Sequence, residues 1–384
     1  MDIAAQISWI ERLIQFDTTS HLSNLTMIED IEAYLAGHGV RSFRAPDDTG
    51  EKTNLYAVIG PDVAGGVVLS GHSDVVPVTD QAWDTDPFTL IQKDGALFGR
   101  GTADMKSFPA ITLSLLPEIV AADLKRPIIL ALSYDEEIGC IGAPRMIERI
   151  ARDLPTPSAV IVGEPTSMRV VDGHKGISSF RTHITGYTTH SSQVERGVSA
   201  VEAAAKLITF LSACRLDNQA NADRSVPFDP PYSTLTVNVM HGGTQLNIMA
   251  GEAWFEWDMR LLPGDKQEMF RARFEEHART VEAQMQAIAP GCAITTEQLT
   301  NAPPLAPRAD NPAADLAKAL TGHNHTEVVA FAAEAGQFQE AGFSTVICGP
   351  GSIDQAHQPN EFITLDQVAV GTKFQRKLIN HLAA

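Results

Sequence analysis

The chain has 384 residues, 44% of them hydrophobic, and a formal net charge of −18. This length favours two domains over a single core, and the hydrophobic content is enough to fill both. The acidic charge argues against nucleic-acid and anionic-membrane partners, and without a long apolar run or a secretory signal in residues 1–20 we expect a cytoplasmic protein.

Strands and helices alternate in the first part of the chain. Periodicity and apolar runs predict helices at residues 3–16, 24–37 and 105–124 and strands at 54–60, 65–76, 126–137 and 158–166. Apolar strands separated by a helix are typical of an α/β layer, because parallel strands need such crossovers and are covered on both faces. We therefore predict an α/β fold with a largely parallel central sheet.

The hydrophobic pattern changes after the segment "GHKG". Alternating strands are predicted at residues 177–187, 233–243, 252–262 and 292–300, and helices at 198–214 and 265–288. This βαββαβ order describes a compact α+β unit. A helix at 312–321 and a buried strand at 343–352 return to the first pattern after the Pro-rich segment "NAPPLAP". We predict a discontinuous catalytic domain of residues 1–177 and 302–384, interrupted by an inserted domain of residues 178–301.

Ionisable side chains recur where the predicted strands of the first domain end. They are His72 and Asp74 in "SGHSDVV", Asp104 in "GRGTADMK", Glu136 and Glu137 in "SYDEEIG", Glu164 in "VGEPTS" and His357 in "SIDQAHQPNEF". Each has an ordinary explanation alone, such as a turn or a core histidine, but open parallel sheets gather ligands beyond the carboxyl ends of their strands. Imidazoles and carboxylates suit a pair of zinc or similar divalent ions. Thiolate ligands are not expected, because the four cysteines lie far apart without a CxxC pair.

These motifs resemble those of the dinuclear zinc deacylase and peptidase superfamily, which contains the acetylornithine deacetylase, succinyl-diaminopimelate desuccinylase, aminoacylase and carboxypeptidase G families. The resemblance covers essentially the whole chain. The segments "GRGTADMK", "VGEPTSMRVVDGHKG", "HSSQVERGVSAVE" and especially "GPGSIDQAHQPNEF" are closest to the acetylornithine deacetylases. The resemblance implies a zinc-peptidase-like catalytic domain with an inserted lid and dimerisation domain, a homodimer, and two Zn²⁺ ions for which Co²⁺ can substitute.

The resemblance also implies how the metals are held. Asp104 would bridge the two ions. His72 and Glu164 would complete one metal site. Glu137 and His357 would complete the other. The bound ions would then activate a water molecule for attack on an amide.

The residues around these ligands also receive roles from the resemblance. Glu136 would stay free of metal and act as the general base of the hydrolysis. Asp74 would be a hydrogen-bond acceptor that fixes the tautomer of His72, with a plain turn aspartate as the alternative. The superfamily has a cis peptide bond after the bridging aspartate, which here joins Asp104 and Met105.

Three further residues match positions that contact the substrate in the superfamily, and a fourth, Glu334, lies in a segment that departs from its pattern. His190 would stabilise the oxyanion, often across a dimer, or it caps a helix. Arg260 would bind the substrate's α-carboxylate, or it only pairs with Asp258. Asn247 would lie in the same pocket, or in a turn. Glu334 would receive a cationic side chain, or it is a structural loop carboxylate.

The resemblance implies a hydrolase, most directly for the zinc-dependent conversion of N-acetyl-L-ornithine to acetate and L-ornithine in arginine biosynthesis. Alanines replace a glycine and a threonine expected just before Glu334, so the activities of other amidases with the same scaffold remain alternatives. These are a succinyl-diaminopimelate desuccinylase, an aminoacylase and an N-acetylcitrulline deacetylase. A non-enzymatic metal- or amino-acid-binding relative would have lost the base or a ligand, and this chain retains all of them.

Overall fold

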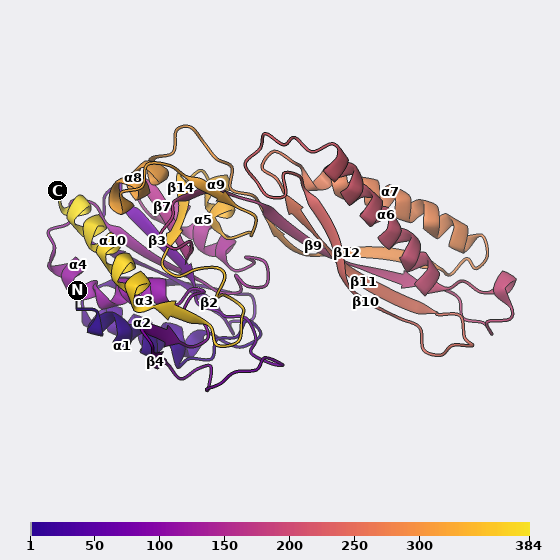
Figure 1. The fold of residues 1–384 in the computed structure, drawn as a ribbon, viewed down its shortest axis with the longest axis horizontal. Coiled ribbons are helices and arrows are strands. Elements are labelled where there is room, and N and C mark those ends of the chain that lie inside the picture. The colour runs from indigo at the N-terminus through magenta and orange to yellow at the C-terminus, as the bar shows by residue number, and fades with distance from the viewer. Residues whose placement is uncertain (1) are drawn as a thin grey trace. The chain divides into compact units, whose positions relative to one another are not determined.

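The computed structural model describes residues 2–384, which form two compact units. Unit 1 comprises residues 2–173, Leu305–Val328 and Ala333–Ala384, and unit 2 comprises His174–Pro304 and Val329–Ala332. The sequence analysis predicted domain boundaries at 177/178 and 301/302. Unit 1 contains both ends of the described chain, so unit 2 is an insertion in the sequence (Figure 1). None of the helices in residues 2–384 is long and apolar enough to span a membrane.

Unit 1 is built on an eight-stranded sheet in the order β1-β2-β6-β3-β7-β14-β8-β13. The four central strands β6, β3, β7 and β14 are parallel, whereas β1, β2 and β8 pair antiparallel with their neighbours. This confirms the predicted α/β class with a parallel central sheet. The strands are β1 (Arg41–Pro46), β2 (Thr53–Ile59), β3 (Val67–His72), β6 (Ile128–Ser133), β7 (Ala159–Pro165), β8 (Val171–His174), β13 (Glu327–Val329) and β14 (Thr345–Gly349).

Helices pack around this sheet and bury one large apolar cluster with it. They are α1 (Ala4–Ile14), α2 (Leu25–Gly37), α3 (Ser107–Ser114), α4 (Leu116–Ala121), α5 (Ala143–Asp153), α8 (Pro312–Thr321), α9 (Ala335–Glu340) and α10 (Leu365–Ala383). The single helix predicted at 105–124 is wrong, because the structure divides it into α3 and α4 at Leu115. Pro117 explains the break, since it has no N–H to continue the hydrogen-bond ladder of α3.

A small sheet in unit 1 was not predicted. It has the order β15-β5-β4, and its strands are β4 (Ile91–Lys93), β5 (Ala96–Phe98) and β15 (Phe362–Thr364). Phe98 lies opposite Phe362 in the antiparallel β5–β15 pair. Strands of three residues carry too little alternation to be recognised from sequence. This pairing brings the segment before Asp104 next to the segment after His357.

Unit 2 has a four-stranded antiparallel sheet in the order β10-β11-β9-β12, with helices α6 and α7 on one face (Figure 1). Alternate residues of β9 and β11 are buried, which supplies the apolar face that the helices cover. The elements are β9 (Gly176–Thr185), α6 (Ala200–Ala220), β10 (Thr234–Gly242), β11 (Glu252–Leu261), α7 (Gln267–Gln286) and β12 (Ala293–Ala302). The predicted βαββαβ order is therefore confirmed.

Candidate metal centre

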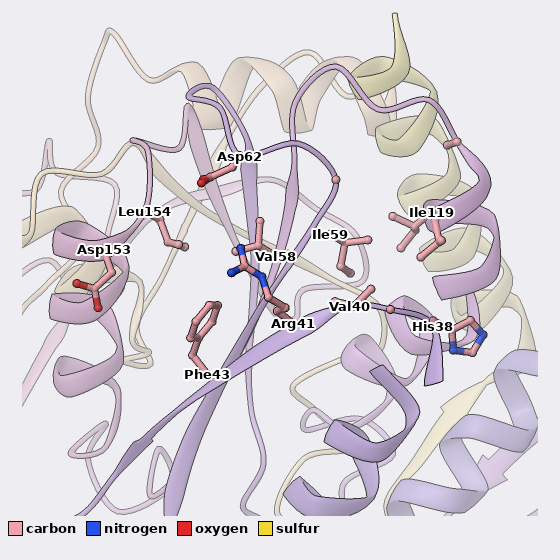
Figure 2. Close-up of a pocket in the computed structure, with 14 residues that line it drawn as sticks. His38, Val40, Arg41, Phe43, Val58, Ile59, Asp62, Ile119, Asp153 and Leu154 are labelled. Atoms are coloured by element: carbon pink, nitrogen blue, oxygen red, sulfur yellow. The ribbon is translucent and has the colours of Figure 1, made fainter. Parts of the chain in front are cut away.

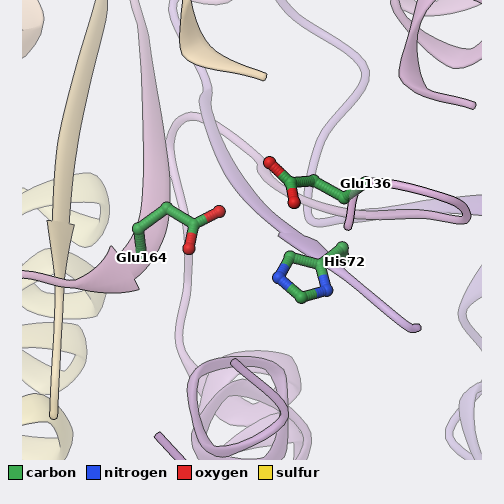
Figure 3. A group of neighbouring side chains, drawn as sticks. All are labelled: His72, Glu136 and Glu164. Atoms are coloured by element: carbon green, nitrogen blue, oxygen red, sulfur yellow. The ribbon is translucent and has the colours of Figure 1, made fainter. Parts of the chain in front are cut away.

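The carboxyl ends of three parallel strands bring His72, Glu136 and Glu164 together (Figure 3). His72 is the last residue of β3, Glu136 follows β6 and Glu164 lies near the end of β7. One possible ligand atom from each of these three side chains lies within 4.8 Å of the others. Gly163, the residue before Glu164, lets α3 pack closely against β7, because a Cβ there would lie 2.1 Å from the ring of Phe108.

Asp104 joins this group to two further predicted ligands. Its Oδ1 atom is 3.0 Å from Nε2 of His72, and its Oδ2 atom is 3.2 Å from Nε2 of His357. The same His357 nitrogen lies 2.9 Å from Oε2 of Glu137. His72, Asp104 and Glu137 form a second set whose ligand atoms all lie within 4.8 Å of one another. All five predicted metal ligands therefore occupy one neighbourhood of unit 1.

Burial and mutual repulsion perturb the carboxylates of this neighbourhood. Burial raises the pKa of Glu136 to about 8, assisted by the charges of Glu137 and Asp104. Burial also raises the pKa of Glu137 to about 7 and that of Glu164 well above its usual range. Carboxylates that cannot all stay ionised together require protons or a cation.

The histidines show the complementary effect. Burial opposes the charged form of His72, but the hydrogen bond with Asp104 and the surrounding carboxylates raise its pKa well above the usual value. Hydrogen bonds with Asp104 and Glu137 raise the pKa of His357 to about 10. Positive charge is thus strongly favoured within this cluster of oxygens.

The donor atoms fit divalent metal ions. Oε1 of Glu137 and Oε1 of Glu164 are buried acceptors without a hydrogen-bond partner among the described residues. A buried polar atom without a partner calls for an explanation such as an ion. Histidine nitrogens and carboxylate oxygens are ligands that zinc accepts, and the absence of sulfur is in keeping with a catalytic site. All four cysteines are free and buried.

Asp74 contacts the imidazole of His72 through its main-chain oxygen rather than through its carboxylate. The acceptor at Nδ1 of His72 is the main-chain oxygen of Asp74, at 2.8 Å, whereas its carboxylate Oδ1 lies 3.6 Å away. The carboxylate instead accepts the backbone N–H groups of Glu136, at 3.1 Å, and Glu137, at 3.2 Å, and the hydroxyl of Ser20 at 2.7 Å. Asp74 therefore orders the loop that carries the two adjacent glutamates, while its carbonyl orients the imidazole.

Cys140 is a neighbour of the site that the sequence analysis did not single out. Its thiol lies 3.1 Å from Oε1 of Glu136 and donates a hydrogen bond to it. A turn places the two residues together, because the N–H of Cys140 donates to the carbonyl of Glu136 at 2.7 Å. The spacing of four residues in "EEIGC" was visible in the sequence, but the turn was not.

Glu334 is fully buried in unit 1. Its Oε1 accepts a hydrogen bond from the hydroxyl of Ser70 at 2.5 Å, and its Oε2 accepts one from Ser133 at 2.7 Å. Ser70 lies in β3 and Ser133 ends β6, so Glu334 ties two central strands together. These contacts favour the structural alternative over recognition of a cationic substrate group.

The remaining predicted residues lie in unit 2. His190 forms an isolated β-bridge with Ile248, and the N–H of Ser191 donates to the carbonyl of Asn247 at 2.9 Å, so His190 and Asn247 are near neighbours. Arg260 lies in β11, where its Nε donates to Oδ2 of Asp258 at 3.1 Å.

Arg260 lies at the opposite end of the unit 2 sheet from His190 and Asn247. Strand β11 begins at Glu252, next to the His190 loop, and Arg260 is its penultimate residue. Eight residues at about 3.3 Å each give a separation of about 26 Å along this strand. One small substrate cannot contact both ends.

Unit 1 also contains a cavity of about 480 Å³ lined by His38, Arg41, Phe43 and Asp153 among others (Figure 2). It lies beyond the end of β2, which pairs with the beginning of β6. The cavity is therefore at the amino ends of the parallel strands, whereas the metal-ligand cluster is at their carboxyl ends. None of the predicted site residues lines it.

Comparison with known proteins agrees with this geometry. The model of peptidase family M20/M25/M40 matches residues 68–381. An acetylornithine deacetylase from Erwinia tasmaniensis is 36% identical over 352 residues, which cover 90% of this chain and 88% of that protein.

Solved structures share the fold at lower identity. An M20 family metallo-carboxypeptidase from Sulfolobus solfataricus has a TM-score of 0.78 and 18% identity, with 100% of each chain covered. The YXEP protein of Bacillus subtilis, described as a dinuclear metal binding peptidase from the M20 family, has a TM-score of 0.62 and 17% identity, with 98% of each chain covered. The chain therefore belongs to peptidase family M20/M25/M40 and is a metal-dependent hydrolytic enzyme that acts on amides.

Proposed function

We propose that this enzyme is a zinc-dependent deacetylase that converts N-acetyl-L-ornithine to acetate and L-ornithine, a step of arginine biosynthesis. The observation that carries the proposal is the 36% identity, across 90% of the chain, with an acetylornithine deacetylase. The motif "GPGSIDQAHQPNEF" supports the same assignment. A desuccinylase, an aminoacylase or an N-acetylcitrulline deacetylase is the alternative within the same chemistry.

Two Zn²⁺ ions would be held by the cluster in unit 1. Asp104, whose two oxygens face different histidines, would be shared between them. His72 and Glu164 would complete one site, and Glu137 and His357 the other. When bound, such ions polarise the acyl oxygen and lower the pKa of coordinated water. Glu137 Oε1 and Glu164 Oε1, two buried acceptors without a partner among the described residues, are the atoms that the ions would satisfy.

Glu136 is the general base in this proposal. Its carboxylate lies among the ligand atoms of His72 and Glu164, and the thiol of Cys140 holds its Oε1. From this position it takes a proton from the attacking water and delivers it to the leaving nitrogen as the C–N bond breaks. Glu137, the adjacent residue, contacts His357 and remains a ligand.

Arg260 and His190 recognise the substrate. The guanidinium of Arg260 binds the α-carboxylate, and the imidazole of His190 stabilises the oxyanion, with Asn247 beside it. Arg260 lies about 26 Å along β11 from Glu252, and His190 lies beyond that end of the strand, so the two residues cannot serve the same substrate within one chain. We therefore place His190 of the partner subunit in each site, which makes a homodimer the catalytic form.

A substrate screen tests this assignment. The zinc-loaded enzyme is assayed with N-acetyl-L-ornithine, N-acetyl-L-citrulline, N-succinyl-diaminopimelate and a series of N-acetyl amino acids. The highest kcat/KM is expected for N-acetyl-L-ornithine, and a higher value for any of the others would replace the proposed substrate. The Glu136→Gln variant keeps the shape of the side chain but cannot accept a proton, so near wild-type turnover of this variant would refute the role of Glu136.

A further inference from the structure

The loop formed by residues 99–104 carries the shared ligand Asp104 and is organised by a carboxylate from a distant part of the chain. Glu361 precedes β15, and the β5–β15 pairing places it beside Gly99, whose N–H donates to its main-chain oxygen at 2.9 Å. The side chain of Glu361 is 1% exposed. It is neither a predicted metal ligand nor a substrate contact.

Both carboxylate oxygens of Glu361 accept two hydrogen bonds. Oε1 accepts the N–H groups of Ala103 at 2.7 Å and of Asp104 itself at 3.0 Å. Oε2 accepts the N–H of Gly101 at 3.1 Å and the guanidinium of Arg100 at 2.7 Å. An ionised carboxylate offers about four acceptor positions, so the group is saturated by this one loop.

The same network reaches the other end of the metal cluster. Arg100 donates a second hydrogen bond to Oε1 of Gln81, and Nε2 of Gln81 donates to the main-chain oxygen of His357 at 3.0 Å. The main chain of His357 has a φ of 62°, which is a left-handed conformation that non-glycine residues rarely adopt. The Gln81 contact therefore supports a main-chain position that local preference does not.

We propose that Glu361 is a positioning residue that fixes the Asp104 carboxylate for metal binding and, through Arg100 and Gln81, sets its spacing from His357. This inference rests on the proposed dinuclear metal site. Residues that hydrogen-bond to a metal ligand without contacting the metal themselves typically change metal affinity by 10- to 100-fold. A neutral amide at position 361 would present one oxygen where four donors need acceptors, so the 99–104 loop would lose its order.

The test measures metal binding directly. Metal-free wild type, Glu361→Gln and Gln81→Ala are titrated with Zn²⁺ by calorimetry, and their Co²⁺ forms are compared by absorption spectroscopy. Asn311→Ala is the matched control, because Asn311 is a buried cap of α8 that accepts from the N–H of Ala314 and has no contact with the 99–104 loop. The Asn311→Ala variant should be less stable than wild type, but it leaves the contacts of Glu361, Arg100 and Gln81 unchanged.

We expect Glu361→Gln to bind Zn²⁺ 10- to 100-fold more weakly and to show an altered Co²⁺ spectrum. Its kcat at saturating metal should fall while KM stays near the wild-type value. Gln81→Ala should show a smaller loss of affinity, and it decides the question if Glu361→Gln does not fold. Wild-type affinity and spectrum in the folded variants, or an equal loss in Asn311→Ala, would overturn the proposal.

The same titration separates this inference from the proposed function. If wild type binds two zinc ions but does not hydrolyse N-acetyl-L-ornithine, only the substrate assignment fails. If wild type binds no zinc, the metal site and the role of Glu361 both fail.

Discussion

Four of the five candidate metal ligands in unit 1 have buried side chains, His357 being 52% exposed, whereas His190 and Asn247 in unit 2 are exposed. In unit 1, His72 and Asp104 are 1% and 6% exposed and are fixed by hydrogen bonds from several elements. In unit 2, His190 and Asn247 are exposed in loops. The Nδ1 atom of His190 lies 2.8 Å from the hydroxyl of Ser192, which is only two residues away in the chain. The metal-ligand cluster is thus preorganised within one unit, whereas the residues for which we propose substrate contacts are less constrained in unit 2.

Removing the metal is the largest perturbation of the preorganised unit. Dialysis against a chelator should lower deacetylase activity by more than about 1,000-fold, because the water would lose its activation and the acyl oxygen its polarisation. The midpoint of thermal unfolding should also fall, since a ligand that binds only the native state stabilises it. Activity assays and thermal melts before and after adding Zn²⁺ check both effects. Hydrolysis that survives complete removal of metal would contradict the proposed mechanism.

Substitutions in unit 2 should leave metal binding intact and still lower kcat/KM. His190→Ala should reduce kcat by about 100- to 1,000-fold through loss of an oxyanion donor. Arg260→Ala should mainly raise KM for substrates with a free α-carboxylate. Zinc stoichiometry by mass spectrometry should stay at the wild-type value in both.

Mixing these two variants tests whether the site is shared between subunits. In the proposed dimer, pairing the two variants would join Arg260 of the His190→Ala chain with the intact His190 of the partner subunit, which should restore one of the two sites. At substrate concentrations well below the wild-type KM, a fully exchanged equal mixture should therefore regain about a quarter of wild-type activity, because about half of the dimers are mixed. No recovery despite proven subunit exchange would place both residues in the same chain's site, against the separation along β11.

A buried histidine outside the metal-ligand cluster tests how burial affects protonation. His174 is fully buried, and burial lowers its pKa to about 4, whereas the carboxylates around His72 raise the pKa of that residue. Between pH 6.5 and 4 the unfolded chain binds a proton at His174 that the folded chain does not, so stability falls as the pH decreases. The contribution lost is up to about 3 kcal/mol. Denaturant titrations of wild type and His174→Gln from pH 7 to 4 should show a shallower decline in the variant. Parallel declines would refute this assignment.

The smallest effect is expected at Cys140. Cys140→Ala removes a single hydrogen bond to Glu136, worth about 1 kcal/mol, and should lower kcat about fivefold with little change in KM. Cys140→Ser keeps a donor in the same place and should recover most of the loss. Equal kcat values in wild type and Cys140→Ala would show that the thiol does not position the base.

Much of unit 1 could be predicted from the sequence because its signals are local. The apolar strands before His72, Glu136 and Glu164 have the length and composition of buried parallel strands, so the positions of these residues at strand ends followed directly. Asp74 could be located but not given its contacts, because side-chain and main-chain oxygens of one residue cannot be distinguished by spacing. The break between α3 and α4 was missed although Pro117 marked it.

The unpredicted features depend on contacts between distant segments. Glu361 was visible only as the end of a motif, and its partners at Arg100 to Asp104 became clear from the pairing of two three-residue strands. The positions of His190 and Arg260 at opposite ends of the unit 2 sheet likewise became clear only from the register of β11 against β9. Neither pairing has a sequence signal of its own, since registers are set by the whole sheet.

The insertion of unit 2 between β7 and β14 dictates an order of events on the ribosome. Strand β14 lies beside β7 in the finished sheet, but the ribosome makes all of unit 2 between them. A nascent chain therefore keeps the hydrogen-bonding edge of β7 open during the synthesis of unit 2, and open edges recruit other strands. Chains that terminate early, before β14 is translated, should aggregate even though unit 2 is complete.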